Sequence, residues 1–277
     1  MNIESVCKLF SLDDDVAVVT GGSGVLCSAI AIGLAKAGAR VALLNRNVEN
    51  AYPIVEKIQE MGGTAMACSC DVTERKSVEN AYNQVMDRFK RVDILVNGAG
   101  GNHPEAIASP KKRFFEIPPE AMTWVMQLNL IGTILPCQVF GEQMAQQNTG
   151  VILNITSMSA YRPLTRVVAY GAAKAAVSNF TQWLAVHLAQ EYSAKIRVNA
   201  LAPGFYLGNQ NRALLIDEKT GNLTPRGKAI LAHTPMARFG NPEDLIGTAL
   251  WLVSPASAFV TGVVVPVDGG YNAFSGV

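Results

Sequence analysis

The sequence predicts an α/β protein in which helices cover both faces of a doubly wound parallel sheet of about seven strands, a three-layer α/β/α arrangement. Two observations predict it. Short apolar runs of strand length alternate with helical patterns along the chain, and the first run is followed by a glycine-rich turn at Thr20–Cys27. Continuous apolar strands separated by helices indicate a parallel sheet buried on both faces. The length of 277 residues and the apolar content of 49% suit one domain over residues 1–277.

The first half of the chain divides into strands and helices by its apolar runs and its glycines. Apolar runs rich in β-branched residues favour strands, and amphipathic stretches that close at glycine favour helices. The expected helices cover residues 29–38, 48–61 and 77–89. The expected strands are 16–19, 41–44, 65–70 and 93–97.

The second half continues the pattern but contains two irregular stretches. Residues 101–120 hold four prolines and no helical or strand period, and residues 205–235 are mixed in character. Long loops often carry groups that cover a site, so we expect both stretches to enclose a substrate. The expected helices are 121–144, 172–192 and one through 250–253, and the expected strands are 151–156, 196–201 and 263–268.

The composition argues against several classes of partner. The net charge of +1 provides no basic surface for nucleic acid or acidic lipid. The N-terminus has no apolar secretion core, and no uninterrupted apolar run has transmembrane length. The five cysteines are scattered without a Cys-x-x-Cys motif. We therefore expect reduced thiols, a cytoplasmic protein, no metal and a small-molecule substrate.

The stretch with the most chemical information is Tyr170-Gly-Ala-Ala-Lys174. On a helix, this spacing places both side chains on one face. A free phenol titrates near pH ~10, and we expect the Lys174 ammonium to lower the pKa of Tyr170, so that it can exchange a proton with an alcohol or carbonyl oxygen. Ser157 follows the strand at 151–156, at the edge where such sheets bind ligands. By itself, however, a Tyr-x-x-x-Lys pair is more often a surface feature.

Together with the glycine turn, these residues resemble the short-chain dehydrogenase/reductase family over about residues 12–270. The resemblance implies a Rossmann-type fold and reversible, NAD(P)(H)-dependent hydride transfer between an alcohol and a ketone. It implies Tyr170 as general acid/base, Lys174 beside it on the nicotinamide ribose, and Ser157 on the substrate oxygen. It also implies that Asn129 supports a water on the proton path, although a buried Asn can simply bond a neighbouring helix.

The resemblance further implies how the dinucleotide is bound. Glycines in the first turn let the backbone approach the pyrophosphate, but here the middle glycine falls one place early, at Gly24, and Cys27 replaces the last one. The second strand ends at neutral Asn45 followed by Arg46, which tolerates a 2′-phosphate, so we expect NADP(H) or NAD(H) with a lean to NADP(H). An exposed loop arginine explains Arg46 equally well. The expected cofactor-binding residues are Gly21, Ser23, Gly24, Val25, Leu26, Asn45, Arg46, Asp71, Val72, Asn97, Ala99, Gly100, Tyr170, Lys174, Pro203 and Gly204.

Within the family, the chain looks most like the reductases of hexonate-type sugar acids, the D-mannonate oxidoreductases (fructuronate reductases). The turn at residues 20–27, the stretches 98–104 and 157–161, and Pro203-Gly-Phe205 are responsible for this likeness. A polyhydroxy keto acid needs hydrogen bonds to its hydroxyls and a cation, here Arg162, Arg166 or Arg212, for its carboxylate. The expected substrate residues are Asn102, His103, Ser159, Arg162, Asn209, Gln210 and Arg212.

Other interpretations stay open at this point. Leu207, Leu214, Leu215 and Ile216 also suit a more apolar ketone, so a gluconate 5-dehydrogenase or a 3-ketoacyl reductase is the alternative within the family. A dinucleotide-binding sensor without turnover is the alternative from another class, and it would be expected to lack the Tyr or the Lys. The small-residue faces of the helices at 121–144 and 172–192 suit a homotetramer, as in the family.

Overall fold

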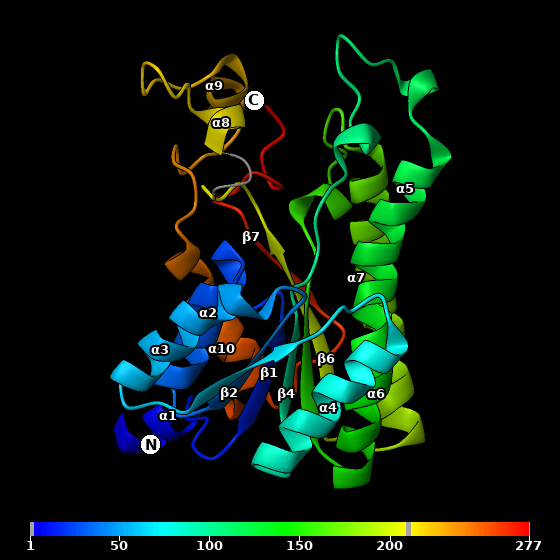
Figure 1. Cartoon of the computed structure of the whole chain (residues 1–277). Coiled ribbons are helices and arrows are strands. Elements are labelled where there is room, and N and C mark those ends of the chain that lie inside the picture. Colours follow the sequence, from blue (N-terminus) through cyan, green and yellow to red (C-terminus); the bar gives the residue numbers. More distant parts are fainter. Residues whose placement is uncertain (1–2, 209–211, 277) are drawn as a thin grey trace.

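The computed structural model describes residues 3–208 and 212–276. Among these residues, seven strands form one parallel sheet in the order β3-β2-β1-β4-β5-β6-β7. Helices cover both of its faces, which confirms the predicted three-layer fold (Figure 1). The strands are β1 (Val16–Thr20), β2 (Arg40–Asn45), β3 (Ala65–Ser69), β4 (Ile94–Asn97), β5 (Gly150–Ile155), β6 (Ile196–Pro203) and β7 (Val264–Val267).

Two helices begin earlier than the sequence pattern suggests. The first helix after the glycine turn begins at Val25, directly after its N-cap Gly24, rather than at residue 29. The helix that carries Tyr170 begins at Val168, so Tyr170 lies in its first turn. The helices are α1 (Ile3–Lys8), α2 (Val25–Lys36), α3 (Tyr52–Glu60), α4 (Arg75–Phe89), α5 (Pro119–Met126), α6 (Gly132–Gln147), α7 (Val168–Glu191), α8 (Arg212–Leu215), α9 (Pro225–Ala232) and α10 (Ile246–Val253).

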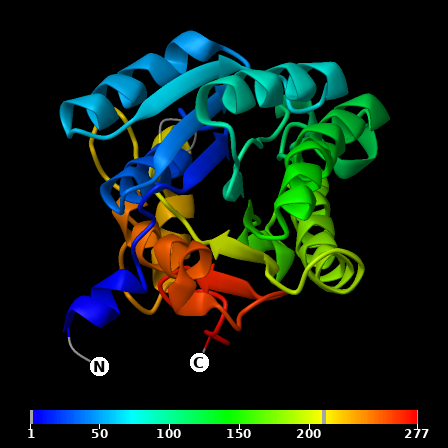
Figure 2. The same ribbon diagram turned by 90° about the horizontal axis from the view of Figure 1, so that it is seen from below.

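The core is divided by the sheet into two layers. Successive side chains of a strand point to opposite faces, so Ala17 and Val19 of β1 pack with residues of α2, α3 and α10. Val16 and Val18 pack on the other face with residues of α4, α6 and α7. Viewed from below, the sheet lies between these two groups of helices (Figure 2).

The strand order reverses at β1, which pairs with β2 on one side and β4 on the other. Ligands of doubly wound sheets bind beyond the carboxyl ends of the strands at such a point. Here Thr20 ends β1, and its Oγ1 accepts hydrogen bonds from the backbone N–H groups of Gly98 and Ala99 at 3.1 and 3.2 Å. The glycine turn and the end of β4 are therefore joined directly.

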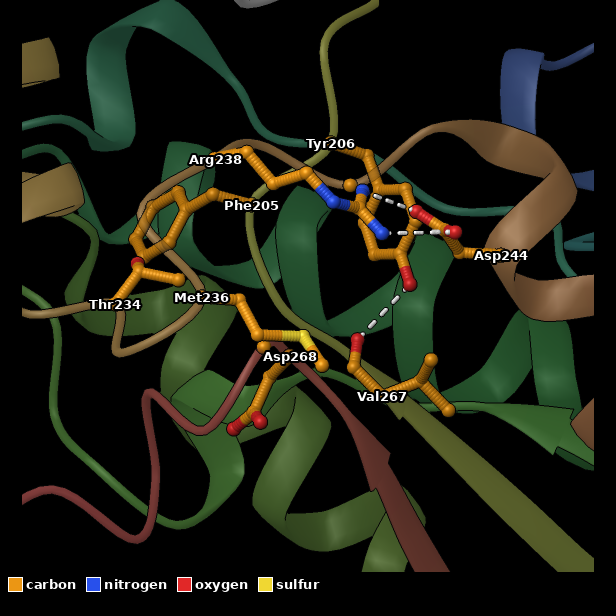
Figure 3. Close-up of a pocket in the computed structure, with 10 residues that line it drawn as sticks. Phe205, Tyr206, Thr234, Met236, Arg238, Asp244, Val267 and Asp268 are labelled. Atoms are coloured by element: carbon orange, nitrogen blue, oxygen red, sulfur yellow. Dashed lines mark hydrogen bonds and ion pairs between the residues drawn. The ribbon is translucent and has the colours of Figure 1, made fainter.

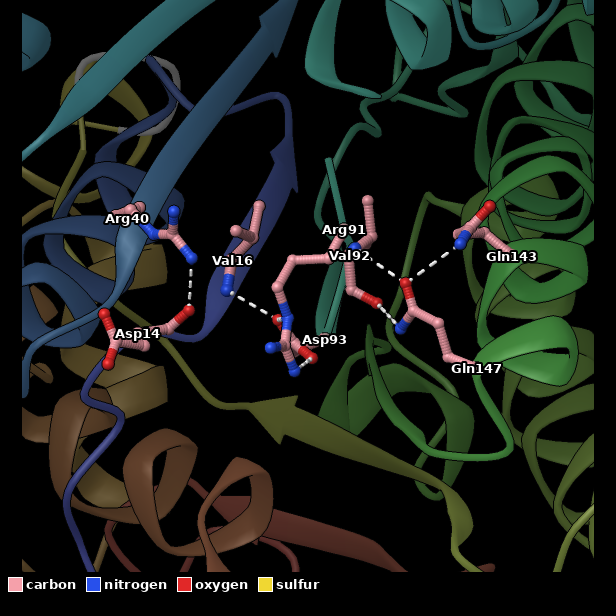
Figure 4. Close-up of polar contacts among 8 residues, drawn as sticks. All are labelled: Asp14, Val16, Arg40, Arg91, Val92, Asp93, Gln143 and Gln147. Carbon is pink, nitrogen blue, oxygen red and sulfur yellow. Dashed lines mark hydrogen bonds and ion pairs between the residues drawn. The ribbon is translucent and has the colours of Figure 1, made fainter. Parts of the chain in front are cut away.

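A polar network connects the amino ends of β1 and β4 with the end of α6 (Figure 4). Asp93, just before β4, is 7% exposed and accepts a hydrogen bond from Val16 N at 2.9 Å. The same carboxylate accepts from Arg91 at 2.8 and 2.6 Å. Gln147 at the end of α6 bonds both the N–H and the C=O of Val92. These contacts hold β1 and β4 in register at their amino ends.

The helix expected at 121–144 is not continuous. Between α5 and α6 the chain forms a π-helical turn at Gln127–Ile131. Such turns are rare and are frequent at functional sites. Asn129 lies within it and is fully buried.

The two irregular stretches contain short elements that their sequences did not reveal. Residues 101–120 form 3₁₀ turns at Pro104–Ala106 and Phe114–Glu116, and residues 205–235 contain α8 and α9. Both stretches rise above the carboxyl edge of the sheet, on opposite sides of it (Figure 1). Among the described residues, no helix is both long and apolar enough to cross a membrane.

Candidate active site

The structure brings Ser157, Tyr170 and Lys174 together at the end of β5. Lys174 is only 4% exposed, and its Nζ donates to the carbonyl oxygen of Ile155 at 2.8 Å. The same Nζ lies 5.7 Å from the centre of the Tyr170 ring. Ser157 follows β5 and makes a side-chain hydrogen bond with the Tyr170 phenol. A ketone oxygen placed beside these two hydroxyls can accept hydrogen bonds from both.

Burial dominates the ionisation of this group. It raises the pKa of the Tyr170 phenol above its ordinary value, and the hydrogen bond with Ser157 opposes that rise. Burial also lowers the pKa of Lys174 to about 8. The expectation that Lys174 lowers the pKa of Tyr170 is therefore wrong for the protein by itself, because the same desolvation disfavours both charges. At neutral pH Tyr170 is a protonated phenol, which suits it to donate a proton to a carbonyl oxygen.

Asn129 is tied to the loop after β4 rather than to a neighbouring helix. Its Nδ2 donates to Gly101 O at 2.7 Å and to Val125 O at 2.8 Å, and its Oδ1 accepts from Gly101 N at 3.2 Å. A Cβ atom at Gly100 would lie 2.7 Å from Asn129 Oδ1 and 3.3 Å from Lys174 Nζ. Only glycine lets the backbone pass this closely to both side chains.

The first turn fits the pyrophosphate of a dinucleotide. Gly21 adopts φ +63°, and a Cβ there would lie 2.9 Å from Ala99 Cα, so no side chain fits between the turn and the end of β4. The residues after Gly24, including Val25 and Leu26, open α2, whose first N–H groups are free to bind an anion.

Asn45 and Arg46 differ in their surroundings. Asn45 is buried and makes two hydrogen bonds with Ser23. Its Oδ1 accepts from Ser23 N at 3.2 Å, and its Nδ2 donates to Ser23 Oγ at 2.7 Å. Its side chain thus shapes the glycine turn. Arg46 is exposed and makes no ion pair with any residue in the described part of the chain, so its guanidinium is available to a ligand.

Other predicted cofactor residues have clear structural partners. Asp71 Oδ1 accepts from Thr73 N at 2.9 Å and from Thr73 Oγ1 at 2.6 Å, which stabilises a local turn before α4. Val72 is buried beside Gly132. Gly204 follows Pro203 at the end of β6 and lies against Asp268. A Cβ atom at Gly204 would lie 2.6 Å from the Cα of Asp268, so a side chain would not fit there.

The side chain of Asn97 is hydrogen-bonded inside the sheet. It is 1% exposed and donates to Asn154 Oδ1 at 2.9 Å. The reason is the pairing of β4 with β5, which places Asn97 directly opposite Asn154. Its role here is to join two central strands.

The predicted substrate residues are only partly available. His103 Nδ1 accepts from Glu105 N at 3.2 Å, and its ring lies 5.2 Å from that of Trp124. Asn102 Oδ1 accepts from His103 N at 3.0 Å. Both side chains therefore shape the 101–120 stretch, and the Ser159 hydroxyl is buried without a partner among the described residues.

Arg162 is engaged elsewhere. Its Nε and Nη2 donate to the carbonyl oxygen of Asn272 at 3.2 and 2.9 Å, which anchors the C-terminal segment. This contact leaves it poorly placed to receive a substrate carboxylate. Arg212 is exposed at the start of α8. Asn209 and Gln210 lie outside the described residues.

A cavity of about 230 Å³ lies at the carboxyl ends of β6 and β7 (Figure 3). Tyr206 OH donates to Val267 O at 3.0 Å, and Arg238 pairs with Asp244 at 2.6 Å. Neither Ser157 nor Tyr170 lines this cavity. Its contacts hold the base of the 205–235 stretch, so it is a neighbour of the Ser–Tyr–Lys group rather than its substrate site.

The departure from the expected glycine turn at Cys27 is in contact with the loop after β4. Cys27 occupies the last glycine position of the turn, and Gly98 directly follows Asn97 at the end of β4. A Cβ at Gly98 would collide with Cys27 Sγ. Cys27 is 4% exposed, and burial raises the pKa of its thiol to about 11, so it stays neutral. The side chain of Cys27 thus fills the space that Gly98 leaves open.

A protonated Tyr–Ser pair, a buried Lys and a glycine turn at the switch point of the sheet define an NAD(P)-dependent oxidoreductase. The family model described as Enoyl-(Acyl carrier protein) reductase matches residues 24–272. The chain belongs to the short-chain dehydrogenase/reductase family. Members of this family act on CH–OH donors, and solved structures of similar proteins carry NAD, NADH or NADP. The protein is accordingly an enzyme that uses NAD(P)(H).

Three similar proteins illustrate the range of the family. An uncharacterised oxidoreductase, UxuB, of Bacillus subtilis is 49% identical over 276 residues, covering 96% of this chain and 98% of its own length. A solved structure from Haemophilus influenzae with bound NAD, provisionally assigned as a D-mannonate oxidoreductase, is 43% identical with a TM-score of 0.91, covering 98% and 100% of the two chains. The 7α-hydroxysteroid dehydrogenase of Escherichia coli is 34% identical over 260 residues, 94% of each chain.

The contact between Cys27 and Gly98 predicts a coupled stability effect. Gly98→Ala should lower the free energy of unfolding by about 1–3 kcal/mol through overpacking. In a Cys27→Ala background the added methyl should cost about 1 kcal/mol less, because the two Cβ atoms would be 3.5 Å apart. Urea denaturation of the four proteins measures this coupling, with Gly247→Ala, which meets open space, as control. An equal cost in both backgrounds would show that the sulfur is not the obstacle.

The buried Lys174 predicts a stability change with pH. Its pKa falls from 10.5 to about 8 on folding, so burying the charge costs about 3 kcal/mol below pH 8. The unfolded chain binds the extra proton between these two values, and the cost fades as the pH rises through them. Lys174→Met should therefore be more stable than wild type at pH 7, and the difference should shrink by pH 10. Urea unfolding at both pH values measures it; a difference that grows with pH would contradict the assignment.

Proposed function

We propose that the enzyme reduces a hexonate-type keto acid, D-fructuronate, reversibly to the hydroxy acid D-mannonate. The observation that supports this most is the 43% identity, over nearly the whole of both chains, to the Haemophilus protein that is provisionally assigned this activity and was solved with NAD. The polar character of the 101–120 stretch and of the residues around Ser157 agrees with a hydrophilic substrate.

In this proposal Ser157 and Tyr170 act on the ketone oxygen, and Lys174 and Asn129 hold the site in place. The Ser157 hydroxyl donates a hydrogen bond to the ketone oxygen, and Tyr170 gives it a proton as the alcohol forms. NAD(P)H, when bound, supplies the hydride. Lys174 lies between Tyr170 and the Gly100 backbone, and the amide of Asn129 holds the loop that contains Gly100 and Gly101. Both residues therefore keep the phenol and the cofactor side of the site in fixed relation.

A more apolar ketone is the main alternative, since a relative at 34% identity is a hydroxysteroid dehydrogenase. Two of the apolar residues that suggest this alternative are engaged in the packing of the 205–235 stretch itself. Leu215 is 2% exposed within the packing of α8, and Ile216 pairs with Leu223 in a short bridge. Another member of the family, such as a gluconate 5-dehydrogenase or a 3-ketoacyl reductase, is the second candidate.

We also propose the remaining cellular properties from this family membership. A lean to NADP(H) is supported by the free, exposed Arg46, while NAD is the cofactor bound to the Haemophilus protein. A homotetramer is supported by the exposed face of α7, where Trp183 and Val186 are each 56% exposed. A cytoplasmic location is supported by five free thiols.

A substrate panel tests the function. We expect D-fructuronate to be reduced fastest at equal concentration, as the proposed substrate. The acetoacetyl thioester should be reduced more slowly than D-fructuronate and 5-ketogluconate, since only these two offer several hydroxyls and a carboxylate. Initial rates are measured with NADH and with NADPH, for wild type and Arg46→Ala. We expect Arg46→Ala to lower kcat/KM with NADPH about tenfold and to leave NADH unaffected. Faster reduction of the thioester than of either sugar acid would refute the proposed substrate.

A further inference from the structure

Three segments around the carboxyl edge of the sheet meet at Thr165 and Arg166. Ala108 N, from the 101–120 stretch, donates to Arg166 O at 2.9 Å. Arg226 Nη1, from α9, donates to Thr165 Oγ1 at 3.4 Å. Thr165 and Arg166 themselves belong to the segment that joins Ser157 to Tyr170. One junction therefore links both irregular stretches to the segment between the two hydroxyl-bearing residues.

The guanidinium of Arg226 is only weakly held at this junction. A separation of 3.4 Å lies beyond the usual range of hydrogen bonds, and the partner is a neutral hydroxyl. The residue is partly buried and its contact with Thr165 is exposed, and within the described residues Arg226 makes no ion pair. A guanidinium without a counter-charge has donors to offer a carboxylate, which it can bind through two parallel hydrogen bonds.

The backbone that carries Arg226 is well fixed. The Thr224 hydroxyl caps α9 by accepting from Gly227 N at 3.0 Å and donates to Leu214 O at 2.7 Å. A side chain at Gly227 would collide with the carbonyl oxygen of Leu215. Helix α9 is thus locked against α8, so Arg226 extends from a rigid base and needs only side-chain motion to exchange partners.

Four other arginines of the segments around the site are less suitable for binding a carboxylate. Arg162 is committed to the carbonyl oxygen of Asn272. Arg166 adopts φ +75° and is exposed, and Arg212 is exposed on a four-residue helix. Arg113 is paired with Glu116 at 2.8 Å.

We propose that Arg226 binds the carboxylate of the substrate, exchanging its bond to Thr165 for a charged, two-point contact. This inference rests on the proposed keto acid function and adds the residue that selects the acid.

The test compares an acid with its neutral counterpart. D-Fructose carries a hydroxymethyl group where D-fructuronate carries its carboxylate. Arg226→Ala should lower kcat/KM for D-fructuronate on the order of 10- to 100-fold, mainly through KM, and leave D-fructose unchanged. Arg226→Lys should recover part of the loss. Lys228→Ala, an exposed cation on the same helix, is the matched control and should behave as wild type.

Thr165→Val separates substrate binding from a purely structural contact. If Arg226 only pinned α9 to Thr165, the valine variant would reproduce the loss, and an equal loss for both substrates would have the same meaning. Either result would overturn the carboxylate-binding role of Arg226. An Arg226→Ala enzyme that keeps its preference for the acid would overturn it as well. In each case the proposed reduction of the keto acid would still stand. If 5-ketogluconate proves to be the preferred substrate, that proposed function fails, and the same comparison with L-sorbose still decides the role of Arg226.

Discussion

The close approach of backbone to side chains at the end of β4 is the constraint on which the site depends. Gly98 faces Cys27, and Gly100 faces Asn129 and Lys174, so a side chain at either glycine would meet an atom already in place. Thr20 holds the same loop by two N–H groups. The backbone of residues 98–101 therefore contacts the glycine turn, the π-helical turn and α7. It does so at the point where the strand order reverses.

This assembly has an energetic consequence. Burial of Lys174 and Tyr170 makes their charged forms unfavourable. The side chains that suit the site for proton transfer therefore lower the stability of the folded protein. The cost is limited because Lys174 Nζ retains the carbonyl oxygen of Ile155 and the phenol retains Ser157. A protonated phenol in a poorly solvated site is well matched to the reduction of a ketone, where an oxygen gains a proton.

The sheet could be predicted because its strands are continuous apolar runs, and the Ser–Tyr–Lys group because its spacing is local. Other features arise only from contacts distant in sequence. The hydrogen bonds of Asn97 and Arg162 could not be predicted, because their partners, Asn154 and Asn272, are far along the chain. Cys27 could be recognised in the sequence as a departure from the family's glycine turn, but its contact with Gly98 could not be predicted. Nothing in the sequence distinguishes Arg226 from the other polar residues of its stretch, because its contact with Thr165 joins residues that are 61 positions apart.

The central claim is that Tyr170 supplies the proton while the rest of the site binds. Single-turnover reduction by Tyr170→Phe, with cofactor binding measured separately by titration, tests it most directly. We predict that the cofactor dissociation constant changes less than about threefold, because little area is lost, and that the rate of reduction falls by roughly a hundredfold or more. A phenylalanine variant that keeps more than about a tenth of the wild-type rate would contradict it.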